Sequence, residues 1–443
     1  MMNKLRTATR MLVMVGTCMS LQAQSVVPAD SLLTLEGCIS IAMEQNYAVQ
    51  MASNSLKITE NNVTMAPFLP SLNLTSAQSS SSASTQQYNS TGVLKGGHSN
   101  SNTWKNNLSL NWTLFDGMEM FATRDKQKVL LDQGHYQFRS IIENLVKTIS
   151  IQYYFIISLH NQVNLLQELV SISQQRYQQA LTRYRIGSDS GLEYKQAKIY
   201  LNSDSASLLV KKEELKNAYI ELNSLMNVPL GNHYIIQDSI QPIAALNVDK
   251  LLAAAYENNT SLLSIKAGER VALLDTRIAK AARYPSLSAS AGYGLNFSST
   301  PYMAGKYDES NGLNGGVTLS IPIFNGFEVS RKVKNAELNR KNAELDYQQT
   351  RQSLESDLRQ LHNSYLNNLR MIEFQEESRD AASMNLEAAM EKYRLGSLAG
   401  IEFRDFQVSY LDASDRKLNA LYQTKVSEIT LRLLAGELYS PAK

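Results

Sequence analysis

The stretches YRIGS at 184–188 and YRLGS at 393–397 are nearly identical, and each follows a Phe-x-Gly motif at the same distance. The glycine of that motif is Gly117 in the first copy and Gly326 in the second, so 184 − 117 = 393 − 326 = 67. The whole segment 108–225 aligns with 317–434 without a gap, at a shift of 209 positions (317 − 108 = 434 − 225 = 209). A long internal repeat with one constant spacing indicates a rigid element whose length matters.

The segment between each Phe-x-Gly motif and each YR-x-G turn contains no proline. Apolar residues recur there at steps of three and four, which is typical of one helix face: Leu354, Leu358, Leu361, Tyr365, Leu369 and Ile372. A helix of ~67 residues is roughly 100 Å long and needs coiled-coil-like lateral packing. Gly187 and Gly396 suit a left-handed cap at its end.

Four shorter helices are predicted in the chain, two in each repeat. Two return helices are expected at about 192–226 and 401–435, and two upstream helices near 35–65 and 248–283, which stop ahead of Pro70 and Pro285. Each return helix is about half as long as its partner. A return helix stacked end to end with an upstream helix would therefore match one long helix.

The segments after Pro70 and Pro285 change period from about 3.6 to 2, which is typical of strands with one apolar and one wet face. The alternating apolar residues are Leu72 and Leu74; Leu108, Leu110, Trp112 and Leu114; Leu287, Ala289, Ala291, Tyr293, Leu295 and Phe297; and Val317, Leu319, Ile321 and Ile323. The polar stretches 79–103 and 298–314 are predicted to be solvated loops.

Four strands in one chain cannot close a barrel of useful size, and open strand edges are not tolerated in lipid. Oligomerisation solves both problems. The competing interpretation is a soluble sheet packed on helices, which gives no reason for elements of roughly 100 Å.

The N-terminal segment 1–23 has the charged, apolar, small-residue order of a secretory signal peptide, with cleavage expected near Ala23. A competing interpretation makes Cys18 a lipidated residue. Without the signal, Cys38 is the only cysteine, which excludes an intramolecular disulfide.

The net charge of +2 and the lack of a basic run argue against nucleic acid as a partner. We expect two structural repeats, at 24–240 and 241–443.

The order, spacing and duplication of these motifs resemble the TolC family of outer-membrane efflux and secretion ducts. The resemblance extends from Leu33 to about Leu438 and includes Asn46 and Asn259 near the middle of the upstream helices. It implies an α+β membrane protein: a homotrimer whose twelve strands form a barrel in the cell outer membrane and whose twelve helices form a tunnel in the periplasm. It also implies a periplasmic adaptor and an inner-membrane transporter as partners, with no cofactor.

The resemblance places adaptor docking at the two turns that end the long helices. The residues concerned are Arg185, Ile186, Gly187, Ser188, Arg394, Leu395, Gly396 and Ser397. The alternative is that both glycines are only helix caps.

An acidic stretch lies near the end of the second long helix. In a trimer its inward-facing members would form rings of three carboxylates, which favour cations. The candidates are Glu387 first, then Asp380 and Glu391. The alternative is a solvated outer face, or pairing with Arg176, Arg183 and Arg185.

The chemistry of an enzyme is not visible in this sequence. The five histidines are scattered without a His-Glu-x-x-His pair, and there is no Gly-x-Ser-x-Gly motif, phosphate loop or cysteine cluster for a metal. The expected function is a passive conduit for small molecules exported by an inner-membrane pump. An exit duct for type I protein or peptide secretion is the alternative within the family, and a non-conducting, periplasm-spanning coiled coil is the alternative outside it.

Overall fold

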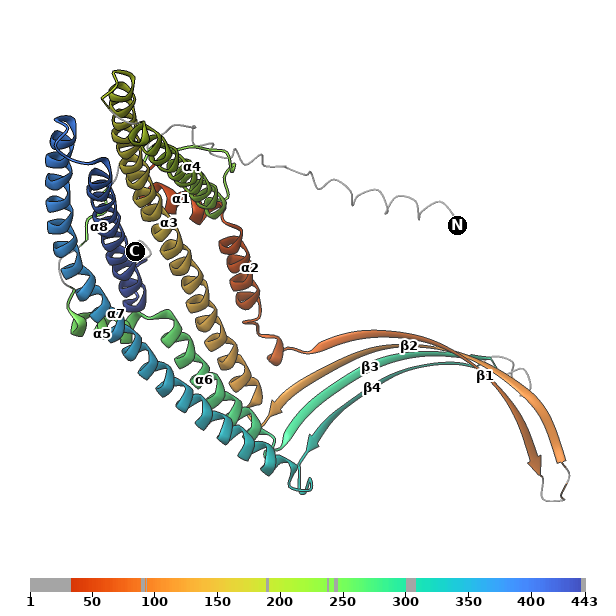
Figure 1. Cartoon of the computed structure of the whole chain (residues 1–443). Coiled ribbons are helices and arrows are strands. Elements are labelled where there is room, and N and C mark those ends of the chain that lie inside the picture. Colours follow the sequence, from red (N-terminus) through yellow and green to blue (C-terminus); the bar gives the residue numbers. More distant parts are fainter. Residues whose placement is uncertain are drawn as a thin grey trace.

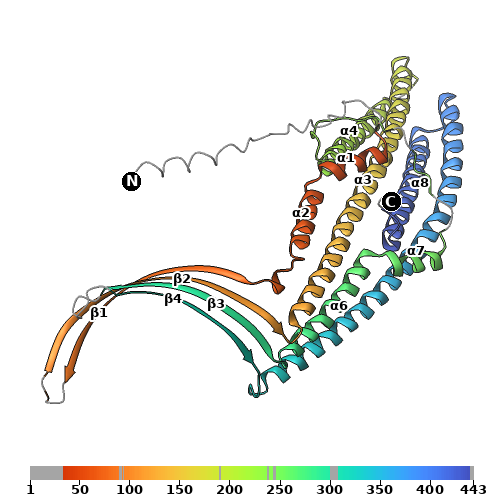
Figure 2. The same cartoon turned by 180° about the vertical axis from the view of Figure 1, so that it is seen from behind.

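The computed structural model describes residues 33–88, 92, 94–188, 191–236, 239–242, 246–299 and 308–439. It is an elongated bundle of helices, continued at one end by a curved four-stranded sheet (Figures 1 and 2). The expected signal peptide and Cys18 lie outside the described residues.

The two long helices are confirmed. Helix α3 spans Glu119–Arg185 and helix α7 spans Glu328–Arg394, with 67 residues each. At 1.5 Å per residue both are about 100 Å long. Each begins after a tight strand-to-helix turn with two successive left-handed residues, Gly117 and Met118 before α3, and Gly326 and Phe327 before α7. At Gly117 a Cβ atom would also lie 2.5 Å from the Ala281 carbonyl oxygen, so this junction has no space for a side chain.

The return helices are confirmed as α4 (Leu192–Met226) and α8 (Gly400–Ala435). The prediction of one continuous helix upstream of each strand pair is wrong. The first consists of α1 (Leu35–Gln45) and α2 (Tyr47–Asn61), and the second of α5 (Val248–Asn258) and α6 (Thr260–Ala281). A single turn of 3₁₀ helix, η1 (Ala66–Phe68), follows α2.

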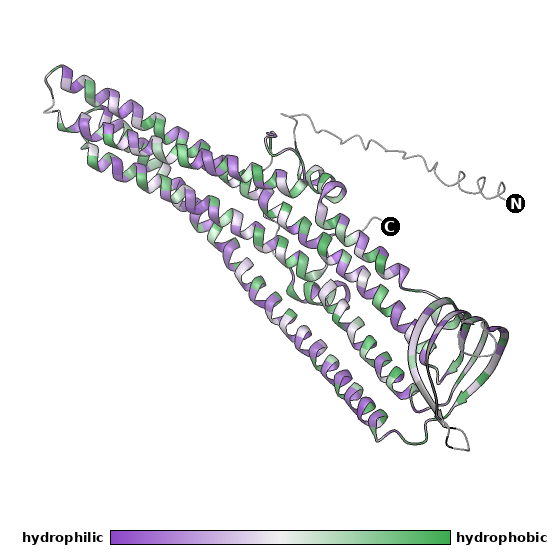
Figure 3. Ribbon diagram, turned by 90° about the vertical axis from the view of Figure 1, so that its right-hand side faces the viewer, coloured by the Kyte–Doolittle hydropathy of each residue, from purple (hydrophilic) through white to green (hydrophobic). Residues whose placement is uncertain are grey.

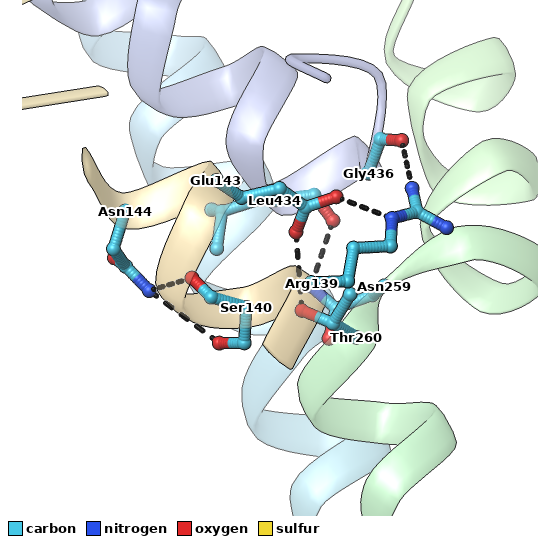
Figure 4. Close-up of polar contacts among 8 residues, drawn as sticks. All are labelled: Arg139, Ser140, Glu143, Asn144, Asn259, Thr260, Leu434 and Gly436. Atoms are coloured by element: carbon cyan, nitrogen blue, oxygen red, sulfur yellow. Dashed lines mark hydrogen bonds and ion pairs between the residues drawn. The ribbon is translucent and has the colours of Figure 1, made fainter. Parts of the chain in front are cut away.

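The break in each upstream helix is a single extended asparagine. The Asn259 Oδ1 atom accepts a hydrogen bond from the Leu262 N–H (2.9 Å) and caps α6, while its Nδ2 donates to the Leu434 carbonyl (3.0 Å) at the end of α8 (Figure 4). Asn46 does the same in the first repeat: it accepts from the Ala48 N–H (2.8 Å) and donates to the Leu225 carbonyl (2.8 Å). Each asparagine thus begins one helix and closes the end of another. The expected end-to-end stacking of α4 with α2, and of α8 with α6, is confirmed.

A buried carboxylate joins the second of these junctions to α3 (Figure 4). Glu143 is 1% exposed, and it accepts hydrogen bonds from Arg139 Nε (2.8 Å) and Thr260 Oγ1 (3.1 Å). Arg139 also donates to the Gly436 carbonyl (2.9 Å), just beyond α8. Burial raises the pKa of Glu143, and the Arg139 charge opposes this. These contacts hold the middle of α3 against the α6–α8 junction.

The helices form four side-by-side columns: α4 stacked with α2, then α3, then α8 stacked with α6, then α7. Equivalent residues join the long helices to the segments ahead of α1 and α5. The Tyr153 hydroxyl donates to the Leu33 carbonyl (3.3 Å), and His362 Nε2 lies 2.7 Å from the Leu246 carbonyl (362 − 153 = 209). Apolar cores surround both positions, and the stripe residues Leu354, Leu358 and Tyr365 are buried in the second.

The sheet is antiparallel with the order β1-β2-β3-β4, so β1 and β4 are its edges. The strands are β1 (Ser71–Tyr88), β2 (Leu94–Asp116), β3 (Ser286–Ser299) and β4 (Asp308–Ser320). The prediction of loops at 79–103 and 298–314 is wrong for most of both stretches. Backbone pairing continues the ladder through polar residues because Ser, Thr and Asn side chains can face water on both sides. Ile321 and Ile323 lie beyond β4, next to Pro322, which has no N–H to donate.

The asparagine junctions are testable. Asn46→Ala and Asn259→Ala each remove a helix cap and leave a return-helix carbonyl without its partner, so each should lower the free energy of unfolding by about 1–3 kcal/mol. Chemical denaturation followed by circular dichroism measures this. Asn62→Ala at the exposed end of α2 is the control, and equal losses in all three variants would contradict the assignment.

Candidate functional site

The two faces of the sheet differ in chemistry. The row Leu74, Leu108, Tyr293 and Leu313 crosses all four strands on one face, and these side chains are between 40% and 83% exposed. The next row, Thr75, Asn107, Gly294 and Gly312, lies on the opposite face. Figure 3 shows the sheet curling like part of a barrel wall. One face is thus built for an apolar environment and the other for water.

Tryptophans lie towards the two ends of the apolar face. Trp112 is near the helical end and donates from Nε1 to the Phe68 carbonyl (3.0 Å). Trp104 donates to the Ser76 hydroxyl (2.9 Å) and lies 6.2 Å from the ring of Phe297. The two tryptophans are eight residues apart on β2, or about 27 Å at 3.4 Å per residue. This is close to the height of an apolar band of about 25 Å flanked by aromatic side chains. The row next to Trp104 on this face is mainly polar, with Ser76, Asn106 and Asn311 beside Leu295.

The opposite face of the sheet is small and polar. In the described side chains it carries mainly serine, threonine, asparagine and glycine, with Lys105, Asp116 and Asp308 as its charged members. Such a face is suited to contact with water.

The two turns at the far end of the bundle have the same geometry. Gly187 and Gly396 have φ of 78° and 79°, which confirms the predicted left-handed caps. The Ser188 N–H donates to the Arg183 carbonyl and the Ser397 N–H to the Lys392 carbonyl, both at 2.9 Å. The predicted docking residues therefore lie at the tips of two neighbouring helical hairpins, α3–α4 and α7–α8. They are exposed from 185 to 188 and from 394 to 397.

A buried cation lies between the two hairpins, below the turns. Arg176 is 3% exposed, forms an ion pair with Glu193 (3.1 Å), and has its guanidinium carbon 5.7 Å from the ring centre of Tyr393. The Tyr393 hydroxyl donates to the same Glu193 oxygen (3.1 Å). Burial raises the pKa of Tyr393, and the nearby Glu193 charge adds to this. A Cβ at residue 400 would meet the Arg176–Glu193 pair, so Gly400 leaves the space for it.

A second buried ion pair lies further from the tip. Arg404 of α8 donates two hydrogen bonds of 2.8 Å to the carboxylate of Asp204 on α4, which is 4% exposed. Ser173 of α3 donates to the same carboxylate (2.5 Å), and Gln407 of α8 donates to the Ser173 hydroxyl (3.4 Å). The Asp204–Arg404 ion pair therefore joins the two hairpins of one chain.

The acidic candidates on α7 are all exposed, so the structure does not gather them into a site within one chain. Asp380 pairs with Arg379 (3.1 Å) and Glu391 with Arg394 (3.2 Å). Glu387 forms none of the ion pairs found among the described residues. The alternative pairing with Arg176 or Arg183 is wrong, because Arg176 binds Glu193 and Arg183 donates to the carbonyls of Tyr393 and Arg394 at 2.8 and 3.3 Å.

Comparison with known proteins identifies the family. Residues 38–228 and 251–437, one stretch in each repeat, match the profile of the outer membrane efflux protein family. The chain belongs to this family. Its helices, within the described residues, include none that is long and apolar enough to cross a membrane.

Several relatives are similar over most of the chain. The outer membrane protein TolC of Escherichia coli (strain K12) is 22% identical over 360 residues, covering 76% of this chain and 70% of TolC. The probable outer membrane lipoprotein SilC of Salmonella typhimurium is 24% identical over 411 residues, covering 90% and 84%.

The fold agrees with solved structures. CusC aligns with a TM-score of 0.73 at 18% identity, covering 93% of this chain and 96% of that one. The Campylobacter jejuni CmeC outer membrane channel aligns with a TM-score of 0.74 at 18% identity, covering 92% and 87%. This is a TolC-family outer-membrane protein, with a helical extension into the periplasm.

The charged contact between the hairpins yields a stability prediction. Asp204→Leu leaves the guanidinium of Arg404 without its partner, and we expect a loss of about 3–5 kcal/mol in the free energy of unfolding. Asp204→Leu combined with Arg404→Leu should recover most of that loss, because no unpaired charge remains. Denaturation followed by circular dichroism measures both variants.

Arg331→Ala is the control, since both members of its ion pair with Glu328 are exposed and the loss of the pair should leave stability unchanged. A double variant as unstable as Asp204→Leu alone would contradict the role given to the ion pair.

Proposed function

We propose that this chain forms the outer-membrane duct of a tripartite efflux system, passively conducting small molecules that an inner-membrane pump delivers through a periplasmic adaptor. The observation that carries this is the two-faced sheet with both edges unpaired, continued by four columns of helices. Backbone groups of open strand edges cannot face lipid, so β4 of one copy must pair with β1 of the next. Three copies give twelve strands, which leave a lumen, whereas an interior of eight is filled by side chains.

The helices support closure into a ring. Phe374 on α7 is 62% exposed, whereas its repeat equivalent on α3, Leu165, is 9% exposed because α3 has columns on both sides (374 − 165 = 209). Leu209 (70%) and Ile220 (45%) on α4 are exposed on the other open side. In the proposed homotrimer α7 packs on the α4–α2 column of the neighbouring copy and buries these residues. The apolar face of the sheet then contacts outer-membrane lipid, and the polar face lines the lumen.

The docking of an adaptor at the tip is supported by apolar residues that are exposed in both repeats. Ile186 (73%) and Leu395 (77%) are repeat equivalents, as are Leu192 (72%) and Ile401 (65%). The contact between the two hairpins of one chain covers neither member of these two pairs. The equivalent contact between neighbouring copies in the ring should leave them exposed as well. All four are exposed in the single chain, and Leu192 and Ile401 line a groove of about 590 Å³ between the two hairpins. We infer that an adaptor's helical hairpin binds there.

Glu387 on α7 is proposed to form a ring of three carboxylates near the tip, with Asp380 and Glu391 as further members. Its exposure and its lack of an ion pair among the described residues support this choice, because Asp380 and Glu391 each lie beside an arginine. The protein transforms no substrate under this proposal and needs no cofactor. An exit duct for proteins or peptides would use the same architecture, and the pump that binds it distinguishes the two.

The duct is tested by mass and conductance. The detergent-solubilised protein should have the mass of three chains and form open or gated channels in planar bilayers. Glu387→Gln should reduce the cation preference and the block by multivalent cations, since three negative charges leave the lumen. Asp346→Gln, on α7 far from the tip, is the matched control. A monomer, or a trimer without conductance, would contradict the duct, and an unchanged cation preference would contradict only the carboxylate ring.

The docking surface is tested in cells that lack their own outer-membrane duct. Ile186→Asp with Leu395→Asp should abolish efflux and adaptor binding while the trimer still forms and conducts, because charge replaces apolar contact area. Leu230→Asp is a control for adding charge at an exposed apolar residue away from the tip. Retained adaptor cross-linking in the double variant would show that docking occurs elsewhere.

A further inference from the structure

The tip carries the same aromatic pair twice, in different surroundings. Tyr184 and Tyr194 have ring centres 4.7 Å apart, and their repeat equivalents Tyr393 and Phe403 stack at 5.1 Å (393 − 184 = 403 − 194 = 209). The second pair is buried, with Tyr393 3% and Phe403 1% exposed. Tyr184, in contrast, is 44% exposed. The difference lies in what covers each pair.

The second pair is covered by the α3–α4 hairpin of the same chain. Arg183 lies 5.1 Å from the ring centre of Tyr393 and donates to the Tyr393 carbonyl (2.8 Å), so it binds both the ring face and the helix end. Glu193 accepts a hydrogen bond from the Tyr393 hydroxyl (3.1 Å). One cation and one carboxylate therefore complete this contact.

The second repeat carries the same two charges at equivalent positions. Lys392 is equivalent to Arg183, and Glu402 to Glu193 (392 − 183 = 402 − 193 = 209). Both side chains are exposed at the tip of the α7–α8 hairpin. This hairpin forms the open side of the chain, because α7 packs on α8 and α6 and has no column beyond it.

We propose that the exposed Tyr184–Tyr194 pair is a contact surface for a second copy of this chain, whose Lys392 and Glu402 cover it as Arg183 and Glu193 cover Tyr393. The inference rests on the proposed ring, in which the second repeat of one copy stands next to the first repeat of another. Lys392 then lies on the ring of Tyr184 and donates to the carbonyls that end α3. Glu402 accepts a hydrogen bond from the Tyr184 hydroxyl.

The contact between copies lacks both of the buried ion pairs found within a chain. The equivalent of Arg176 is Asn385, and the equivalent of Asp204 is Ala413 (385 − 176 = 413 − 204 = 209). Neither can form the corresponding ion pair. At the tip, the seam between copies is therefore held by fewer charged contacts than the seam between the two hairpins of one chain.

Cysteine cross-linking of the full-length protein in membranes tests the proposal. Tyr184→Cys combined with Lys392→Cys, treated with a short bis-maleimide, should shift the chain on denaturing gels from its own mass to two and three times that mass. Each single variant should stay at the mass of one chain. Cys38 stays in place, because it is fully buried and burial raises the pKa of its thiol to about 12.

Glu376→Cys with Lys417→Cys is the matched control, since these residues form an ion pair within one chain (2.7 Å) and their cross-link adds no mass of a second copy. If native mass determination gives a monomer, the ring itself fails. If it gives a trimer and the Tyr184–Lys392 pair stays at the mass of one chain, only this inference is overturned.

A charge reversal provides a second measurement. In the proposed contact, Lys392→Glu places a carboxylate beside the carbonyls that end α3 of the neighbouring copy, so the trimer should dissociate at a lower temperature with helix content unchanged. An unchanged dissociation temperature would overturn the inference. Lys334→Glu, near the other end of α7, is the matched control.

Discussion

Two helices of 67 residues must each bury their apolar residues against neighbours, and among the described residues no other helix is long enough to cover either of them. The structure meets this constraint by joining shorter helices end to end. Asn46 and Asn259 cap α2 and α6 with one side-chain atom and bind the final turns of α4 and α8 with the other. The buried Glu143 then fixes the second junction to α3. The joints where α4 meets α2 and where α8 meets α6 depend on these few hydrogen bonds.

The same constraint leaves the chain incomplete by itself. α3 has a column on each side, but α7 and the α4–α2 column each have one open side, and β1 and β4 have unpaired edges. In the bundle and in the sheet alike, one open side belongs to the first repeat and the other to the second. A single rotation that relates neighbouring copies can therefore bring both pairs of open sides together. The repeat also separates two kinds of exposed residue. Under the two proposals, residues exposed in both repeats, such as Ile186 and Leu395, bind an adaptor, whereas a residue exposed in one repeat only, such as Tyr184, binds a second copy of the chain.

The tip combines buried charges with an apolar core. Arg176 and Asp204 are buried there close to the cluster of Leu386, Ala389, Tyr393 and Phe403. The Asp204–Arg404 ion pair joins the two hairpins, as the buried Glu143 joins α3 to the α6–α8 junction. Charged contacts are directional and fail together when one partner is removed, whereas apolar contacts tolerate sliding.

The sequence by itself determined the repeat, the length of α3 and α7, the bounds of the return helices and the two-faced strands, because these follow from spacing and period along one segment. It also placed Gly187 and Gly396 as caps. It did not show that Asn46 and Asn259 interrupt helices, since each acts through a carbonyl about 175 to 179 positions away. The sequence also did not show that β1, β2 and β4 continue through their polar segments. The hydrogen bonds of a ladder join backbone atoms, so they form whether the side chains are polar or apolar. The pairing of Asp204 with Arg404, 200 positions apart, was decided only when packing brought α4 and α8 together. Contacts between distant segments have no local signal, and the tertiary structure alone supplies them.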